Sequence, residues 1–424
     1  MVDSEPVIQG RSNVQPGSLS RVRFFAIVAG PLFVLYLVTA TWTTPYNMDS
    51  LTNALTAAEI ADDGDPFLEE HEPLAEARFQ GYAGWIVTAG DTAASHYPPG
   101  AAAVAAPFYM VWAEGDGLAE YTDVDGEGVV LPLPSLFPAA IASALVAAIT
   151  VGLLALAFRL LAEDRLALAA AYLAGLGTGV WAVAADSLWQ HGPAMMWLAA
   201  GMLLSISSGL RAGFAYGAAL LTRPHTAVVA ACNGLWISWQ RRSIVPALKI
   251  AVGGSVGLAA LIGYNKYVFG GASVEGGYGS SFRERLLSTD LLDFVGNALL
   301  GLVHPTSGLL IYTPFLLVLF FGIPEAWRKA PAWVQGSAIG GLVYLLIQWK
   351  ANRYSGGGGF WGYRYPLEAL AVAAPLLFLS YTEWVRKKAP AWVRKVFRWS
   401  AILSIELTAL GALIYSTLWH SLVF

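Results

Sequence analysis

Residues 21–42 read RVRFFAIVAGPLFVLYLVTATW, in which two arginines precede an apolar run from Phe24 to Trp42. About 20 mostly apolar residues are needed for a helix to cross the hydrocarbon core of a bilayer, and this run is nearly that long. Because no small-x-small cleavage site closes it, we interpret it as an uncleaved first span and not as a signal peptide. Basic residues collect on the cytoplasmic side, so we expect the tail 1–23 inside the cell and Thr43 outside.

The composition extends this interpretation to the whole chain. Of its 424 residues, 56% are apolar and only 13% are charged, whereas about 25% are charged in a typical soluble domain. Similar apolar runs recur as far as the C-terminus. The single cysteine, Cys232, excludes an internal disulfide framework and a cysteine-based metal cluster. We therefore predict an integral membrane protein with one transmembrane domain, residues 24–424.

The distribution of charge gives the predicted orientation. The stretch 43–135 contains 16 of the 29 acidic residues but only one of the 25 basic residues, Arg78, as expected of a loop on the outer face. The other basic clusters should mark cytoplasmic turns. They are Arg159 with Arg165, Arg211, Arg241 with Arg242, Arg328 with Lys329, and the group from Arg386 to Arg398.

Threading the chain between these anchors predicts an all-α polytopic membrane protein with about 11 transmembrane helices. The segment 213–239 is interpreted as a hairpin of two short helices, and 270–300 as an outer loop. Gly100–Ala113 is too short to cross and should lie along the outer interface as a helix, so the long first outer loop carries interfacial structure. The remaining spans are expected at 24–42, 136–160, 166–185, 193–209, 247–268, 301–324, 332–349, 366–384 and 399–420.

Asp49 is the first candidate for chemistry. It lies seven residues beyond the first span, where the dielectric constant is lower than in bulk water. A carboxylate held there beside a substrate hydroxyl can act as a general base. The alternative is an ordinary helix cap, because an aspartate before Leu51–Leu55 starts a helix well. On its own, the position of Asp49 in the sequence favours the interpretation as a helix cap.

Two further outer segments could contact an anionic ligand. In Ser95–Gly100, two prolines fix an extended approach that would display His96 and Tyr97 at the membrane surface; the alternative is a turn that contains an imidazole. The glycine-rich loop 350–366 carries three of the few outer cations and could clamp a phosphate; the alternative is a flexible linker. Its cations are Lys350, Arg353 and Arg364.

Other polar residues are expected to line a cavity at the outer ends of the spans. Arg223 lies with His225 inside an apolar segment, which makes it a functional candidate. A structural cation that binds backbone carbonyls is the simpler interpretation of Arg223. We find no ligand cluster that requires a metal, so no metal site is predicted. The other cavity-lining candidates are Asp186, Gln190, His191, Tyr278 and Tyr363.

In their order along the chain, these motifs resemble the GT-C membrane glycosyltransferases, a superfamily that includes the protein O-mannosyltransferases and the lipid A aminoarabinose transferase. The resemblance covers roughly residues 20–370. It rests on an Asp after span 1, a Tyr-Pro-Pro-Gly step in the long outer loop, an Arg-Pro step in the middle spans and two later segments. In this chain they are Asp49, Tyr97–Gly100, Arg223-Pro224, Gly308–Pro314 and Gly362–Pro366.

The resemblance implies a transferase that moves a sugar from a polyprenyl-phosphate donor to an acceptor hydroxyl at the outer face, with inversion. Asp49 would be the general base, and His96 and Tyr97 would lie near the lipid phosphate. Some relatives have a lysine where Tyr97 stands, so we expect Lys350, Arg353 or Arg364 to supply the missing cation. The acceptor would be a lipid, a glycan or a protein, in the plasma membrane of a prokaryote. No cofactor is required, although a divalent metal is compatible with such chemistry.

Two other classes of function were weighed. A transporter or flippase for a lipid-linked saccharide would explain the spans and Arg223, and it predicts ionisable groups at mid-membrane depth. A scaffold would use the acidic loop to bind partners. Membrane lipids are partners in every case, and nothing in the sequence suggests nucleic acid binding.

Overall fold

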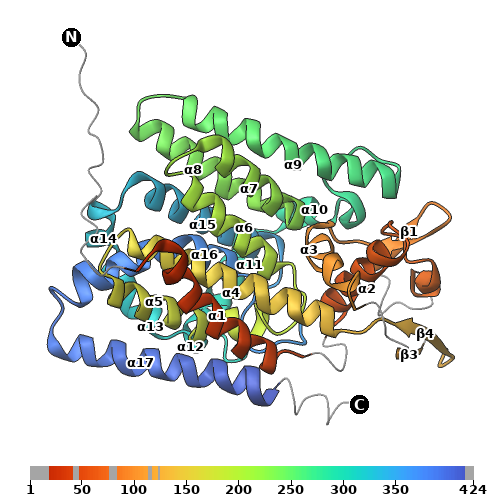
Figure 1. Cartoon of the computed structure of the whole chain (residues 1–424), viewed down its shortest axis with the longest axis horizontal. Coiled ribbons are helices and arrows are strands. Elements are labelled where there is room, and N and C mark those ends of the chain that lie inside the picture. Colours follow the sequence, from red (N-terminus) through yellow and green to blue (C-terminus); the bar gives the residue numbers. More distant parts are fainter. Residues whose placement is uncertain (1–18, 42–46, 76–83, 113–116, 123–124, 416–424) are drawn as a thin grey trace.

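The computed structural model describes residues 19–41, 47–75, 84–112, 117–122 and 125–415, and its helices pack side by side into a bundle (Figure 1). The predicted helical fold is confirmed. Four helices in the described residues are long and apolar enough to cross a membrane, and a bent pair would make a fifth. The chain is therefore an integral membrane protein. Several other helices at predicted spans are shorter, so the total of about 11 spans stays a prediction.

The first half of the bundle follows the predicted apolar runs closely. Ser20 caps the first helix by accepting a hydrogen bond from the backbone N–H of Arg23, at 3.2 Å. The predicted hairpin at 213–239 is present, and its two helices meet at Arg223-Pro224 because proline cannot continue a helix. The helices are α1 (Arg21–Thr39), α4 (Phe137–Arg159), α5 (Asp164–Leu176), α6 (His191–Leu204), α7 (Gly209–Thr222), α8 (Ala227–Gln240) and α9 (Val245–Phe269).

Helices α7 and α9 are in backbone contact because glycines face each other. A Cβ added at Gly253 would lie 2.3 Å from the carbonyl oxygen of Leu210, and one added at Gly257 would lie 2.3 Å from that of Gly217. Side chains at either position would push the helices apart. Spacing small residues four apart is a common way for membrane helices to approach closely.

The second half departs from prediction at 301–324, where one continuous span was expected. The chain instead breaks after Val303 and again at Thr313, next to Pro305 and Pro314, because a proline lacks the N–H that a helix interior needs. The short helices are α10 (Ser281–Ser288), α11 (Leu291–Val303), α12 (Leu309–Tyr312), α13 (Phe315–Phe320) and α14 (Ile323–Lys329). Helices α10 and α11 are bent by 105° and lie in the predicted outer loop 270–300.

The last three long helices match the remaining predictions with one shift. They are α15 (Ala332–Ala351), α16 (Leu367–Ser380) and α17 (Ala391–Leu410). The final helix begins at residue 391 and not at 399, because Pro390 is a favourable residue at a helix start and the basic turn continues as helix. Helices α16 and α17 are extended by π-helical turns at Tyr381–Val385 and Gly411–Tyr415.

The outer loop 43–135 is more structured than predicted. It contains α2 (Met48–Asp62), a 3₁₀ turn (Glu69–Ala75), the short apolar helix α3 (Gly100–Tyr109) and two antiparallel hairpins. The hairpins pair β1 (Ile86–Ala89) with β2 (Thr92–Ser95), and β3 (Gly117–Thr122) with β4 (Gly128–Leu133). A small apolar core holds the loop together. It contains Leu51, Leu55, Leu68, Leu74 and Ile86.

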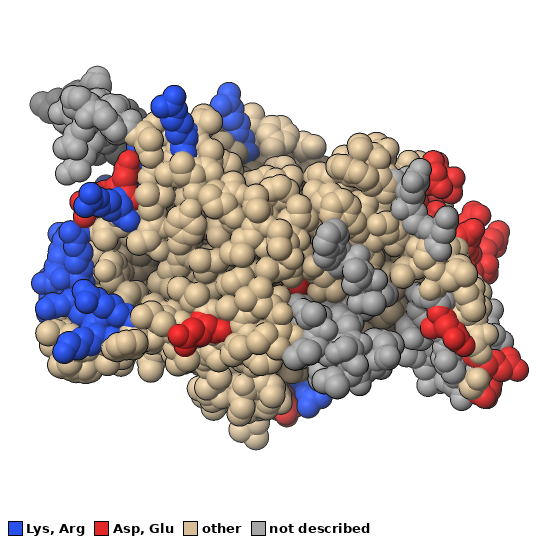
Figure 2. Space-filling model, turned by 60° about the horizontal axis from the view of Figure 1, so that its bottom comes forward, with Lys and Arg blue, Asp and Glu red and all other residues tan. Residues whose placement is uncertain are grey.

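The charges separate along the long axis of the molecule. In Figure 2, most of the visible Lys and Arg lie toward one end, with a few Asp and Glu among them, and the charged residues at the other end are Asp and Glu. The acidic end is the one that holds α2 and the hairpins of the outer loop (Figure 1). This is the distribution that the positive-inside rule expects of the predicted orientation.

Candidate functional site

Asp49 is not the cap of its helix. Asn47 caps α2, because its side-chain oxygen accepts the backbone N–H of Ser50 at 3.0 Å. The alternative interpretation of Asp49 as the cap is therefore wrong. Asp49 lies in the first turn, where the helix dipole favours a negative charge. Its carboxylate is left free to make tertiary contacts.

Three donors from three segments converge on the Asp49 carboxylate. The indole N–H of Trp85 donates to Oδ1 at 2.5 Å, and Nη1 of Arg364 donates to Oδ2. The hydroxyl of Tyr97 is a further hydrogen-bond partner. The Asp49 and Arg364 side chains are only 16% and 14% exposed. The result is a largely buried carboxylate–guanidinium pair that joins the first outer loop to the glycine-rich loop.

These contacts determine the protonation state of Asp49. Burial alone would raise its pKa, but the positive charge of Arg364 and the hydrogen bonds from Tyr97, Arg364 and Trp85 outweigh burial and lower the pKa to about 2. The carboxylate is therefore ionised at neutral pH. It is also a weak base for as long as Arg364 stays paired with it.

Aromatic rings enclose the Arg364 guanidinium. Its central carbon lies 4.7 Å from the ring centre of Trp189, 5.4 Å from that of Phe360 and 5.3 Å from that of Tyr365. Such cation–π contacts are worth about 0.5–2 kcal/mol each, the upper end applying where water is excluded. The Nε of Arg364 is buried and has no hydrogen-bond partner among the described residues, so this cation can donate a further bond.

His96 and Tyr97 form an aromatic cluster with Tyr278 beside Asp49. The His96 ring centre lies 4.0 Å from that of Tyr97 and 4.9 Å from that of Tyr278. Burial lowers the pKa of His96 to about 4, against the raising effects of Asp49 and a backbone hydrogen bond to Gly84, so the imidazole is neutral at pH 7. The structure thus brings both predicted residues together with Asp49.

A second buried ion pair joins Glu368 of α16 to Arg223 in the turn between α7 and α8. The Nε of Arg223 is 3.2 Å from Oε1 of Glu368, and His191 Nδ1 is 2.9 Å from the same oxygen. Arg223 also contacts His225 Nε2 at 3.2 Å and Gln348 Oε1 at 3.4 Å. The expectation that Arg223 would bind backbone carbonyls is therefore wrong, since these partners are side chains.

Close backbone packing connects the two ion pairs. A Cβ on Gly100, at the start of α3, would lie 2.6 Å from the backbone of Thr222, so only glycine lets α3 approach the residue before Arg223. A second link runs through Tyr278, whose hydroxyl donates to Gln190 Oε1 at 3.2 Å. Gln190 directly precedes His191 in the chain. The two pairs are thus parts of one polar cluster.

Four predicted site residues make their contacts elsewhere. Lys350 donates to the carbonyl of Thr289 at 2.8 Å, and the exposed Arg353 lies over the ring of Tyr354. Asp186 accepts from the hydroxyl and the backbone N–H of Thr41. The Tyr363 hydroxyl accepts the backbone N–H of Gly179 at 3.3 Å. In the described part of the chain, none of these contacts involves Asp49 or Arg364.

Trp85 and Glu368 contact the predicted site residues but were not singled out in the sequence. Trp85 carries no local signal, because only the fold brings its indole to Asp49. Glu368 did carry one, since it is an acid within the apolar span predicted at 366–384. Its side chain is 0% exposed.

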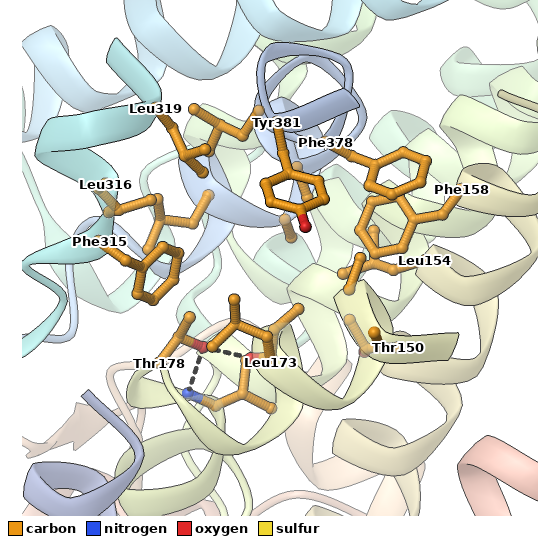
Figure 3. Close-up of a pocket in the computed structure, with 18 of the residues that line it drawn as sticks. Thr150, Leu154, Phe158, Leu173, Thr178, Phe315, Leu316, Leu319, Phe378 and Tyr381 are labelled. Atoms are coloured by element: carbon orange, nitrogen blue, oxygen red, sulfur yellow. Dashed lines mark hydrogen bonds between the residues drawn. The ribbon is translucent and has the colours of Figure 1, made fainter. Parts of the chain in front are cut away.

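A cavity lined by apolar side chains lies apart from these groups. It has a volume of about 180 Å³ between α4, α5, α13 and α16, and its lining contains no charged side chain. Figure 3 shows Phe158, Phe315, Phe378 and Tyr381 around it. The hydroxyls of its threonines donate to backbone carbonyls of their own segments, so the walls are apolar. Besides these threonines, the Tyr381 hydroxyl is the polar side-chain group in the lining, so a sugar or phosphate would find no charged partner there. Within the described residues, no three His, Cys, Asp or Glu side chains are grouped as metal ligands.

No family model and no curated protein matches the chain. Among solved structures, it is similar to ArnT from Cupriavidus metallidurans, in a crystal structure bound to undecaprenyl phosphate. The similarity covers 93% of this chain and 76% of that one, with 14% sequence identity and a TM-score of 0.47. A likeness at this level carries no argument about substrate or mechanism.

Proposed function

We propose that this protein is a membrane glycosyltransferase that moves a sugar from a polyprenyl-phosphate donor to an acceptor hydroxyl at the outer face. One observation carries the proposal. Asp49 and Arg364 lie 315 residues apart in the sequence and form a largely buried pair beside His96 and Tyr97. A base and a phosphate-binding cation are the two groups that this reaction needs.

In the proposed reaction, Asp49 accepts the proton of the acceptor hydroxyl while its oxygen attacks the anomeric carbon of the sugar. The bond between that carbon and the phosphate oxygen breaks, and polyprenyl phosphate leaves with the electron pair. Attack from the face opposite the leaving group inverts the anomeric centre. Arg364 stabilises the charge that develops on the phosphate, because a guanidinium stays protonated and can donate two parallel hydrogen bonds.

The resting pair explains why the base would act only when donor is bound. With Arg364 beside it, Asp49 has a pKa of about 2 and attracts protons weakly. A donor phosphate that draws the guanidinium away removes the largest of the influences that lower this pKa, and burial then raises it. The unpartnered Nε of Arg364 provides the first bond to the phosphate.

A transporter or flippase for a lipid-linked saccharide is the second candidate, and a specific observation favours it. Arg223 and His225 are ionisable groups within the apolar segments. Glu368, which pairs with Arg223, is a third such group. Buried ion pairs at such positions are typical of transport pathways. The two functions differ in chemistry, because transport leaves the donor intact.

The experiment uses the full-length protein in vesicles, with a labelled polyprenyl-phosphate sugar and candidate acceptors. A transferase releases polyprenyl phosphate and yields a glycosylated acceptor, whereas a transporter moves the intact donor between leaflets. We expect Arg364→Ala to lower transfer at least 100-fold. Arg283→Ala is the matched control, because Arg283 is an outer arginine whose side chain is 62% exposed. Intact donor crossing the membrane without product would overturn the assignment.

A further inference from the structure

The buried charges of the polar cluster cancel. Asp49 and Glu368 supply two negative charges, and Arg364 and Arg223 supply two positive charges. A phosphodiester that enters this cluster brings one negative charge. An unbalanced charge in a region shielded from water is costly, so an additional positive charge would favour binding.

His191 is the residue best placed to supply that charge. Its Nδ1 lies 2.9 and 3.0 Å from the two carboxylate oxygens of Glu368. Because a carboxylate can only accept, Nδ1 carries the ring hydrogen and Nε2 keeps the lone pair. Nη1 of Arg223 lies 3.0 Å from Nε2 and 3.2 Å from Nδ1. A proton can reach Nε2 only when this guanidinium moves.

The other groups around His191 do not replace it in this role. Helix α4 also packs on α6 and carries no titratable side chain before Arg159, at its far end. The second imidazole near Arg223 has no carboxylate partner among the described contacts; it stacks on Phe282 and Tyr344. Among the described residues, Glu368 from α16 and Arg223 from the turn before α8 contact His191, and Arg364 and Tyr365 approach it from the segment before α16. His225 from the same turn also interacts with it, and Tyr278 reaches its neighbour Gln190.

Arg223 has unused donors beside it that an anion could engage. Within the part of the chain that the structure describes, three buried nitrogens have no hydrogen-bond partner: the side-chain nitrogens of Gln348 and Gln190 and the indole nitrogen of Trp189. These side chains are at most 5% exposed. Gln348 already touches Arg223, and Trp189 lies against Arg364. An anion between the two guanidinium groups would therefore gain new bonds from these donors.

We propose that an anionic phosphodiester binds with the uptake of one proton by His191. Nη1 of Arg223 moves from the imidazole to a phosphate oxygen, and Nε2 of His191 takes the proton. The resulting imidazolium stays paired with Glu368, so the cluster with its ligand is again neutral. His191 and Glu368 are then positioning residues for Arg223. This inference rests on the proposed function, because it takes the donor's phosphodiester as the anion.

The test counts protons during binding to the full-length protein. The probe is a short-chain prenyl methyl phosphate diester, which holds one fixed negative charge and no sugar, so every proton taken up belongs to the protein. Titration calorimetry between pH 6 and 8, in two buffers with different ionisation enthalpies, measures the number directly. We expect uptake of one proton per ligand and a Kd that rises about tenfold for each unit of pH.

Variants assign the proton to its residue. In His191→Gln, uptake is lost and Kd no longer depends on pH, and Glu368→Gln has the same effect because the imidazolium loses its partner. His304→Gln, at a histidine whose side chain contacts Thr306 and Tyr354, keeps the wild-type proton count. Thermal melting identifies any variant that fails to fold. Even then, a wild-type protein that binds the probe without taking up a proton would overturn the inference.

The possible outcomes separate the two proposals. A wild-type protein that binds no probe overturns the proposed function together with this inference. Binding without proton uptake, or uptake that persists in folded His191→Gln, overturns the inference alone. Uptake that disappears in His225→Gln but not in His191→Gln also overturns it, because the proton would then belong to the other imidazole.

Discussion

Replacing Asp49 with asparagine tests the base assignment. The new amide oxygen can still accept from Trp85, but Arg364 loses its counter-ion. Removing one partner of a buried pair costs about 3–5 kcal/mol of folding free energy. We expect the lower end of this range, since three aromatic rings still surround the guanidinium. Separately, losing a general base lowers the chemical rate about 10²–10⁴-fold, equivalent to about 3–5 kcal/mol in the barrier.

The assay separates the two losses. Thermal melting reports the stability change, and single-turnover transfer from a labelled donor reports the rate. Glu59→Gln on the same helix is the matched control, because it removes one acid from α2 away from Arg364 and should leave transfer within about twofold. In the double variant Asp49→Asn with Arg364→Gln, stability should recover in part, because no unpaired cation is left buried. The rate should not recover.

Two results would refute this reasoning. If Asp49→Asn transferred sugar at the wild-type rate, the carboxylate would not be the base. If the variant melted at the wild-type temperature, the buried pair with Arg364 would contribute nothing to stability, and the pairing described above would be wrong.

Three further predictions concern helix packing, the Asp49 hydrogen bond and pH. Gly257→Ala should cost about 1–3 kcal/mol of stability by overpacking α7, whereas Gly254→Ala, whose added carbon would have its nearest neighbour at 3.7 Å, should melt like wild type. Trp85→Phe removes a charge-assisted hydrogen bond worth about 1.5–3 kcal/mol, so a pH–rate profile should show a higher pKa for Asp49. Burial and then nearby acids raise the pKa of Glu59 to about 7. Stability should therefore fall as pH rises from about 4.5 to 7, and fall less in Glu59→Gln.

The local pattern of apolar residues was sufficient to predict most of the long helices. The runs at 136–160, 247–268 and 332–349 became α4, α9 and α15 with boundaries shifted by at most two residues, because a continuous apolar run has few alternatives to a helix in hydrocarbon. The break in 301–324 was also encoded locally. Pro305 and Pro314 mark it, but hydropathy alone does not register the missing N–H groups.

The site was predicted in part. Asp49, His96, Tyr97 and Arg364 were selected from topology and motifs, and they lie together. Lys350 and Arg353 were also selected, because they are cations in the same glycine-rich loop as Arg364. Their contacts are with Thr289 and Tyr354 and not with Asp49. Sequence proximity in a glycine-rich loop does not fix the direction of each side chain, because several backbone conformations are open to the glycines.

The sequence by itself determined that the chain lies in a membrane and that its long apolar runs are mostly helical, and it indicated which end is acidic. These properties follow from the local cost of burying or exposing each side chain. Only the tertiary structure decided which charges pair. Asp49 meets Arg364 across 315 residues, and His191 meets Glu368 across 177. Such partners are selected by the requirement that buried charges be neutralised, which depends on the packing of the whole bundle.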